Sequence, residues 1–231
     1  MSTPQAPGIV EAVCVLHAER DSGTRRVTRT AIDKRPVDGP VQVDRAGLAG
    51  DYVCDTEHHG GRFKAVYSYD AAEAARWEQE LDRTLPFGWF GENLRISGMP
   101  ITDAVIGERW RIGSAADIDS GKGITELEVT GPRTPCGTFG VWAQEPRWVA
   151  RFSERGDTGA YLSVVAPGPV CAGDTVHRVF VPEHGVTVRD LFTGRDPERF
   201  ADMLAQQKDL SPTVADKARK RMAGLEVRVM Y

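Results

Sequence analysis

Glu128-Val-Thr-Gly-Pro-Arg-Thr-Pro-Cys-Gly-Thr-Phe139 is the stretch around which the chain is organised. An apolar, strand-like run over Ile124 to Val129 leads into it. Two glycines and two prolines then follow, and residues of these types so close together continue neither a strand ladder nor a helix. The sequence therefore predicts that Cys136 lies on a bent loop that leaves a strand.

Cys136 has a cation, Arg133, three residues before it. A guanidinium beside a thiol favours the thiolate, which is both a nucleophile and a ligand for soft metals. A packing role explains the pattern equally well, because free cysteine is among the most buried residue types. One Arg-x-x-Cys pattern does not decide between these interpretations.

Outward from this stretch, the chain consists of short strand-like segments separated by turn signals, a pattern typical of a β-barrel or sandwich. A capped helix is expected from residue 71 to about 81, a short helix at 147–152, and a hairpin loop at 117–123. Two short strands are expected within 101–112. The other expected strands are 9–17, 25–32, 41–43, 64–69, 160–165 and 176–181.

The pattern becomes helical after Pro182, where we place the boundary between a domain over 1–182 and an appendage over 183–231. Three helix-start signals follow: a capping box at 187–190, and prolines at 197 and 212 suited to the first helical position. Three short helices bury too little apolar surface to be stable alone. We expect them to dock on their own barrel or to form a homodimer contact.

Composition excludes several classes of protein. The formal net charge of −4, from 29 basic and 33 acidic residues, argues against a general binder of nucleic acid or of anionic membranes. No long apolar run and no export-signal layout occur, so a cytoplasmic protein is expected. The four cysteines are scattered and form no Cys-x-x-Cys pair, which argues against structural zinc.

Several polar residues are candidates for a binding site. Lys34 and Arg35 precede a proline, and adjacent cations on a rigid loop can hold a phosphate, although the residues alone slightly favour a solvated pair. Of the adjacent His58 and His59, at most one can face a pocket. Asn93 and its neighbour Glu92 are either pocket groups or the polar residues of a turn.

Taken together, these stretches resemble the MOSC domain family, named for the C-terminal domain of molybdenum cofactor sulfurase, and most of all its bacterial YiiM-like branch. The resemblance covers residues 9 to 180, and residues 185–222 resemble a three-helix appendage that this branch often carries. The matching blocks are Lys34-Arg-Pro-Val37 with Gly39, Gly47 to Asp51, His58 to Gly61, Lys64-Ala-Val-Tyr67, Phe90-Gly-Glu-Asn-Leu94 and Thr130-Gly-Pro-Arg-Thr-Pro-Cys136.

The resemblance implies a mainly β, barrel-like domain with a few short helices, a small C-terminal α-helical appendage and a pocket for the molybdenum cofactor (molybdopterin). It implies that Cys136 is the catalytic residue and the metal ligand, or carries sulfur. It also implies that Lys34 with Arg35 anchors the cofactor's phosphate, and that Arg133 holds the pterin end or lowers the thiol pKa. The implied pocket wall contains His59, Asn93 and Glu92.

The implied activity is reduction of N-hydroxylated small molecules such as hydroxylaminopurines, a detoxification. Nothing resembles a flavin, haem or iron–sulfur module, so electrons must come from separate electron-transfer proteins. The alternative is a non-catalytic carrier of the cofactor or of sulfur. Pyridoxal phosphate binding, also associated with the family, would require a fused domain for which 231 residues leave no room. A third interpretation is a barrel that binds a phosphorylated small molecule, with Cys136 structural.

Cys54 departs from the family pattern, where a polar or small residue is expected. It is either packed in the interior or faces the pocket. In the second case it offers another thiol or forms a disulfide with Cys136.

Overall fold

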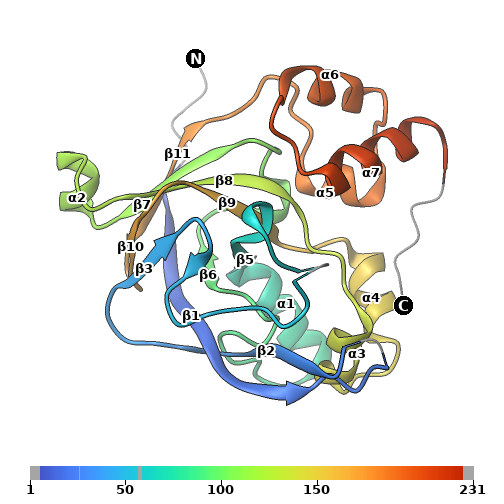
Figure 1. Ribbon diagram of the computed structural model, residues 1–231, viewed down its shortest axis with the longest axis horizontal. Helices are drawn as coiled ribbons and strands as arrows, with labels where there is room; N and C mark the ends of the chain where they lie inside the picture. Colours follow the sequence, from blue (N-terminus) through green and yellow to red (C-terminus); the bar gives the residue numbers. More distant parts are fainter. Residues whose placement is uncertain (1–5, 26, 57–58, 226–231) are drawn as a thin grey trace.

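The computed structural model describes residues 6–25, 27–56 and 59–225, and its centre is a closed β-barrel (Figure 1). Within these residues seven strands follow one another in the order β11-β7-β8-β9-β5-β6-β1, and β1 pairs back with β11. The pairing is antiparallel except between β5 and β6. The barrel strands are β1 (Gly8–Asp21), β5 (Val66–Asp70), β6 (Leu94–Ser97), β7 (Arg109–Gly113), β8 (Thr125–Pro132), β9 (Ala160–Ala166) and β11 (Thr175–Phe180).

Two further β elements lie against the barrel. Strand β2 (Arg29–Pro36) pairs with the long strand β1 and extends the sheet beyond the closed ring. A small sheet contains β10 (Gly168–Val170), β3 (Val41–Asp44) and β4 (Gly47–Leu48) in that order.

Strands β7 and β8 show why these sequences form strands of the barrel. Trp110 and Leu127 are fully buried, and the residues beside them in the chain point outward. On the outer face, Arg109 lies opposite Glu128 with Nε 2.8 Å from Oε2, and the next outward pair along the strands is also an ion pair. This alternation has the period of two that a half-buried strand requires.

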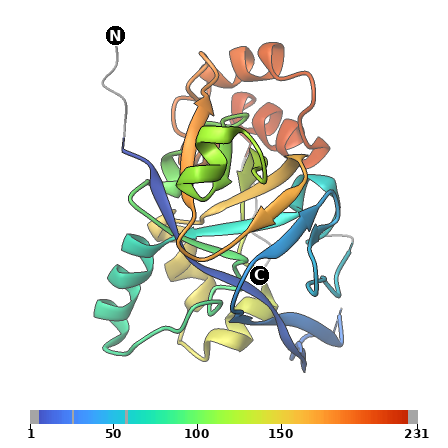
Figure 2. The same cartoon turned by 90° about the vertical axis from the view of Figure 1, so that its left-hand side faces the viewer.

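Apart from α2 (Ala115–Ser120), which lies by itself beyond β7, the α-helices form two groups at the two ends of the barrel (Figures 1 and 2). At one end lie α1 (Ala71–Leu81), α3 (Gly137–Ala143) and α4 (Trp148–Arg155). Asp70 caps α1 by accepting from the backbone N–H of Ala72 at 2.7 Å. These helices enclose a second core in which aromatic rings pack stacked, tilted or edge to face. It includes Trp77, Trp89, Phe90, Phe139, Trp148 and Phe152.

The C-terminal helices dock on the other end of the barrel. They are α5 (Val188–Thr193), α6 (Arg199–Gln206) and α7 (Pro212–Met222). Their apolar side chains, including Leu191, Phe200 and Val214, belong to the same buried cluster as the barrel strands. Arg189 fixes α5 with an Nε–Oδ1 distance of 2.7 Å to Asp103 and a second ion pair to Asp157. The appendage therefore packs on its own barrel, one of the two arrangements expected; whether it also contacts a second copy stays a prediction.

The fold class predicted from the sequence is confirmed, but several local predictions were wrong. Strand β8 does not end at Val129 but continues to Pro132, which lies opposite Ala160 of β9, and the strand expected at 25–32 is β2 at Arg29–Pro36. The expected hairpin loop at 117–123 contains α2 (Ala115–Ser120), because Ser114 accepts from the backbone N–H of Asp117 and Gly121 ends the helix in a left-handed conformation. The first of the strands expected within 101–112 is a 3-10 turn. Helix α6 begins at Arg199, two residues after the proline expected to start it.

Helix α3 was not predicted from the sequence.

Among the described residues no helix is long and apolar enough to span a membrane. The boundary at Pro182 stays a prediction.

Gly88 permits a close approach between the turn before β6 and strand β2. Its φ is 85°, and a Cβ there would collide with the carbonyl group of Lys34. We expect Gly88→Ala to lower the free energy of unfolding, measured by urea denaturation, by about 1–3 kcal/mol beyond the cost of the positive φ. The matched control is Gly50→Ala, where φ is 82° and no atom lies within 4 Å, so that only the strain of about 1–2 kcal/mol remains. An equal loss of unfolding free energy in the two variants would show that the Cβ at residue 88 does not collide with Lys34.

Glu73 of α1 makes stability depend on pH. Burial, together with the nearby carboxylate of Asp157, raises the pKa of Glu73 from 4.5 to about 8. Between these values the folded chain holds a proton that the unfolded chain releases, so the free energy of unfolding falls as pH rises from about 5 to 8. We expect Glu73→Gln to flatten this part of the profile in denaturation experiments at a series of pH values. A profile that keeps the same slope in the variant would assign the dependence to another group.

Candidate functional site

Two adjoining cavities open where β8 leaves the barrel toward α3. Their volumes are about 550 and 150 Å³. The larger cavity lies between the barrel and the C-terminal helices, and the smaller one lies between β2, residues 51–55 and 59–61, and β5. The residues that line both are Val27, Asp55, His59, Lys64, Cys136, Thr138 and Tyr161.

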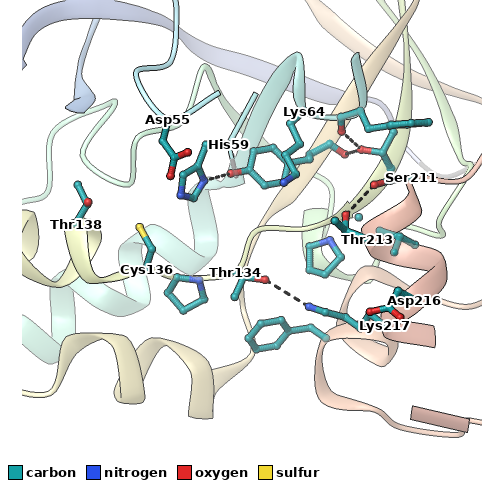
Figure 3. Close-up of a pocket in the computed structure, with 18 of the residues that line it drawn as sticks. Asp55, His59, Lys64, Thr134, Cys136, Thr138, Ser211, Thr213, Asp216 and Lys217 are labelled. Atoms are coloured by element: carbon teal, nitrogen blue, oxygen red, sulfur yellow. Dashed lines mark hydrogen bonds between the residues drawn. The ribbon is translucent and has the colours of Figure 1, made fainter. Parts of the chain in front are cut away.

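Cys136 lies at the junction of the two cavities. Strand β8 ends at Pro132, and the loop that follows brings Cys136, in extended conformation, to the position just before α3. Its side chain is half-buried, with the sulfur directed toward the wall that carries Asp55 and His59 (Figure 3). The bent loop predicted from the sequence therefore places a thiol where a ligand in either cavity can reach it.

Arg133 brings a buried positive charge to the smaller cavity. Its guanidinium lies over the ring of Phe139, 4.0 Å from the centroid, and 5.3 Å from the centroid of Tyr67. The Nη1 atom is buried and has no hydrogen-bond partner. A buried donor without an acceptor is costly, so Arg133 is suited to bind an acceptor atom of a ligand.

Lys34 is neutralised by a buried ion pair. It projects inward from β2 and pairs with Asp51, and both side chains are less than a tenth exposed. Asp51 also accepts from the Nδ2 of Asn93 at 2.7 Å and from the backbone N–H of Leu16 at 3.0 Å. Burial lowers the pKa of Lys34, while the Asp51 carboxylate opposes that shift. The positive charge that the sequence offered as a phosphate anchor thus has its counter-ion within the protein.

Hydrogen bonds within the protein also fix the side chain of Asn93. Its Oδ1 accepts from the backbone N–H of Tyr67 at 3.0 Å, and its Nδ2 donates to the carbonyl of Cys14 at 3.2 Å as well as to Asp51. Both ends of the amide are therefore engaged in fixing β1, β5 and the Asp51 loop together. Asn93 lines the smaller cavity as part of this frame.

Arg35 lies outside both cavities. The expected rigid loop is the end of strand β2, where neighbouring side chains point to opposite faces. Arg35 is therefore more than half exposed, with its Nε 3.2 Å from Asp33. Glu92 also lies outside them; it is fully buried, paired with Arg95, and accepts from the backbone N–H of Gly88 at 3.0 Å.

His59 and Tyr161 form a polar pair on the shared wall, with Nδ1 3.2 Å from the phenol oxygen (Figure 3). Burial raises the pKa of Tyr161 to about 12, so its hydroxyl keeps its proton at neutral pH. The other histidine of the motif, His58, lies outside the described residues.

Cys54 faces the smaller cavity and is half-buried, and burial raises the pKa of its thiol. In the part of the chain that the structure describes, every cysteine is a free thiol. The disulfide considered between Cys54 and Cys136 is therefore not formed.

The sequence interpretation missed the wall contributed by α7. Lys217 reaches across the larger cavity to Thr134, with Nζ 3.4 Å from Oγ1. Arg221 lines the same wall. The sequence does contain basic residues one helical turn apart in this segment, which place positive charge on one face of the helix. This spacing did not reveal which face of the helix meets the barrel.

The described residues contain no cluster of three or more His, Cys, Asp or Glu side chains arranged to hold a metal ion. A metal bound beside Cys136 would therefore have to bring most of its ligands with it.

Comparison with known proteins agrees with this architecture. The family model of the MOSC domain matches residues 55–177. The protein YflK of Bacillus subtilis (strain 168) is 31% identical over 160 residues, which are 69% of this chain and 68% of YflK. A protein named "Reductase" from Gibberella moniliformis (strain M3125 / FGSC 7600) is 29% identical over 177 residues, or 75% of this chain but 29% of the reductase.

Among solved structures, YiiM from Geobacillus stearothermophilus superposes with a TM-score of 0.72 at 22% identity. The match covers 94% of this chain and 100% of that one. The similarity therefore extends over the barrel and the C-terminal helices together.

Removing the counter-ion of Lys34 tests the buried frame of the site. We expect Asp51→Asn to lower the free energy of unfolding by about 3 kcal/mol, because it leaves a buried ammonium without its carboxylate. The matched control is Glu126→Gln, whose partner Arg111 is half exposed, and which should cost less than about 1 kcal/mol. Adding Lys34→Met to Asp51→Asn should restore part of the loss. A cost for Asp51→Asn as small as that of the control would contradict the assignment.

Proposed function

The chain belongs to the MOSC domain family, and on this premise we propose that it binds the molybdenum cofactor beside Cys136 and reduces N-hydroxylated small molecules. The observation that carries the proposal is the half-buried Cys136 thiol at the junction of two cavities, with the buried guanidinium of Arg133, whose Nη1 has no partner, lining the smaller one.

The residues present fit this cofactor. Thiolate suits a soft metal centre, and a single protein thiolate is enough where the pterin supplies further sulfur ligands. The absence of a three-ligand cluster among the described residues agrees with such a metal and disfavours a bare ion. A cavity of about 550 Å³ beside one of about 150 Å³ offers the volume of a typical small-molecule site.

Individual residues take distinct roles in this proposal. Cys136 is the metal ligand, and Arg133 offers Nη1 to an acceptor of the pterin. His59 contacts the ligand from the shared wall, whereas Lys34 and Asn93 hold that wall in place through Asp51. That Arg35 binds the cofactor's phosphate stays a prediction. Its outward position and its ion pair with Asp33 argue against this role.

When bound, the cofactor would supply the redox centre for a two-electron reduction. Conversion of an N-hydroxyl to an amine and water consumes two electrons and two protons. The protein's contribution is a proton source: Tyr161 holds a proton on its phenol oxygen at neutral pH, and His59 is placed to replace it. This pair borders both cavities and thus the space beside Cys136.

The electrons come, in this proposal, from a separate protein. The matched part of the fungal reductase is 29% of its length, so the activity of that whole protein extends to this chain only as a proposal.

The second candidate function is a carrier of the cofactor or of sulfur. Cys54 favours it, because a second free thiol lines the same small cavity as Cys136. A persulfide on Cys136 could be released as hydrosulfide by attack of the Cys54 thiolate, which leaves a disulfide between the two. Retention of cofactor without turnover would distinguish this function from the reductase.

Metal analysis tests the shared premise. In protein purified from a molybdate-supplied host that makes the cofactor, we expect one molybdenum and one pterin per wild-type chain and at least about a tenfold loss in Cys136→Ser. Cys171→Ser is the matched control, because Cys171 is also half-buried but lines neither cavity. Equal molybdenum in wild type and Cys136→Ser, or none in either, would contradict the site.

Turnover tests the reductase assignment with the same preparations. We expect the loaded wild type to reduce a hydroxylaminopurine when a chemical reductant is supplied, and Cys136→Ser to be inactive. NADH alone should give no turnover, and NADH-driven turnover by the pure chain would contradict a separate electron donor.

A further inference from the structure

The wall of the larger cavity formed by α7 carries positive charge that the protein itself does not neutralise. Among the described residues that line this cavity are four cations, Lys64, Lys217, Lys220 and Arg221, and two carboxylates, Asp55 and Asp216. This is the reverse of the situation at Lys34, whose counter-ion is built into the fold.

The two carboxylates are not distributed evenly over the four cations. Asp216 pairs with Lys220 one helical turn away, with a distance of 2.7 Å between Oδ2 and Nζ. Asp55 lies on the opposite wall, near Lys64. Among residues 6–25, 27–56 and 59–225, no carboxylate lies within ion-pair distance of Lys217 or Arg221.

The side chain of Lys217 is directed into the cavity. Its ammonium lies 3.4 Å from the hydroxyl of Thr134 and 5.4 Å from the ring centroid of Phe192, so its partners there are neutral (Figure 3). Arg221 donates from Nη2 to the carbonyl of Phe192 at 2.6 Å, while its Nε is buried without a partner. Both residues therefore retain donors that the protein leaves unused.

Holding these charges together is unfavourable in the absence of a ligand. Burial, together with the neighbouring charges of Arg221 and Lys64, lowers the pKa of Lys217 to about 8. An anion placed between Lys217 and Arg221 would relieve both the repulsion and the unsatisfied donors.

We propose that Lys217 and Arg221 form an anion subsite that binds the phosphate group of a ligand in the larger cavity. The hydroxyls of Thr134, Ser211 and Thr213 also line this cavity and suit the several oxygens of a phosphate. The inference rests on the proposed function in taking the cavity as the ligand site. The phosphate belongs either to the cofactor or to a phosphorylated substrate.

Calorimetric titration of the cofactor-free full chain with inorganic phosphate tests the subsite. We expect binding to the wild type at pH 7 and at least about tenfold weaker binding to Lys217→Met and to Arg221→Met, since each removes a charge-assisted hydrogen bond. The matched control is Lys122→Met, an exposed lysine beside α2, which should bind as the wild type does. Phosphate affinity of Lys217→Met equal to that of the wild type would overturn the inference.

Two further readouts separate this role from a structural one. Lys217→Met should melt no lower than the wild type without phosphate, because it removes an uncompensated charge, and added phosphate should raise the melting temperature of the wild type more than that of the variant. The affinity of the wild type for phosphate should also weaken from pH 7 to 9, because Lys217 loses its proton in this range. The charged groups near Lys217 are Arg221, Lys64 and the ion pair of Asp216 with Lys220. A melting temperature lowered in the variant together with unchanged phosphate stabilisation would assign Lys217 to the fold alone.

Molybdenum and pterin analysis of Lys217→Met identifies the source of the phosphate. Loss of the cofactor assigns the subsite to the cofactor's phosphate. Retention of the cofactor, with a lost preference for phosphorylated over unphosphorylated substrate, assigns it to the substrate. The result of the phosphate titration does not depend on the metal content of Cys136→Ser. Failure of the subsite and failure of the proposed function are therefore separate outcomes.

Discussion

Pairing of β8 on both its edges is the constraint on which the site depends. Arg109↔Glu128 on the β7 side and Val129↔Leu162 on the β9 side fix the direction of the strand, and after an irregularity between Val129 and Gly131 the pairing with β9 continues to Pro132. Because the strand cannot shift, the loop after it begins at a fixed point on the barrel rim. Arg133 and Cys136 therefore reach the cavities from a rigid support, as a site that must hold a ligand in one geometry requires.

Buried Lys34 and half-buried Lys217 show how the same residue type serves opposite purposes. Lys34 sits with Asp51 and Asn93 in a closed network whose charges and hydrogen bonds are satisfied within the protein. Lys217 sits beside Arg221 with no carboxylate of the described chain to neutralise it. A satisfied network stabilises and positions its surroundings, whereas an unsatisfied one lowers stability until a ligand arrives. The first type belongs to the frame of the site, and the second is suited to binding.

The appendage has a structural role and a second role at the cavity. Its apolar side chains join the barrel core, and Arg189 fastens it through Asp103 and Asp157. The same docking brings Lys217 over the larger cavity, so the barrel alone would leave one wall of the cavity open. Membership of the MOSC domain family accounts for the barrel, and the docked helices add to it the charge that we connect with ligand binding.

The sequence by itself determined the local elements and the family. Asp70 and Thr187 marked helix starts, and Ser211-Pro212 marked a third. These features depend on backbone conformations and caps that involve residues close in the chain. The end of β8 expected at Val129 was wrong, because Gly131 and Pro132 still pair with β9. Only the tertiary structure decided that Lys34 faces Asp51 while Arg35 points outward, because that depends on which face of β2 the barrel covers. It alone placed Lys217 opposite Thr134, 83 residues earlier in the chain, since the sequence pattern of a helix shows its faces but not the surface against which it docks.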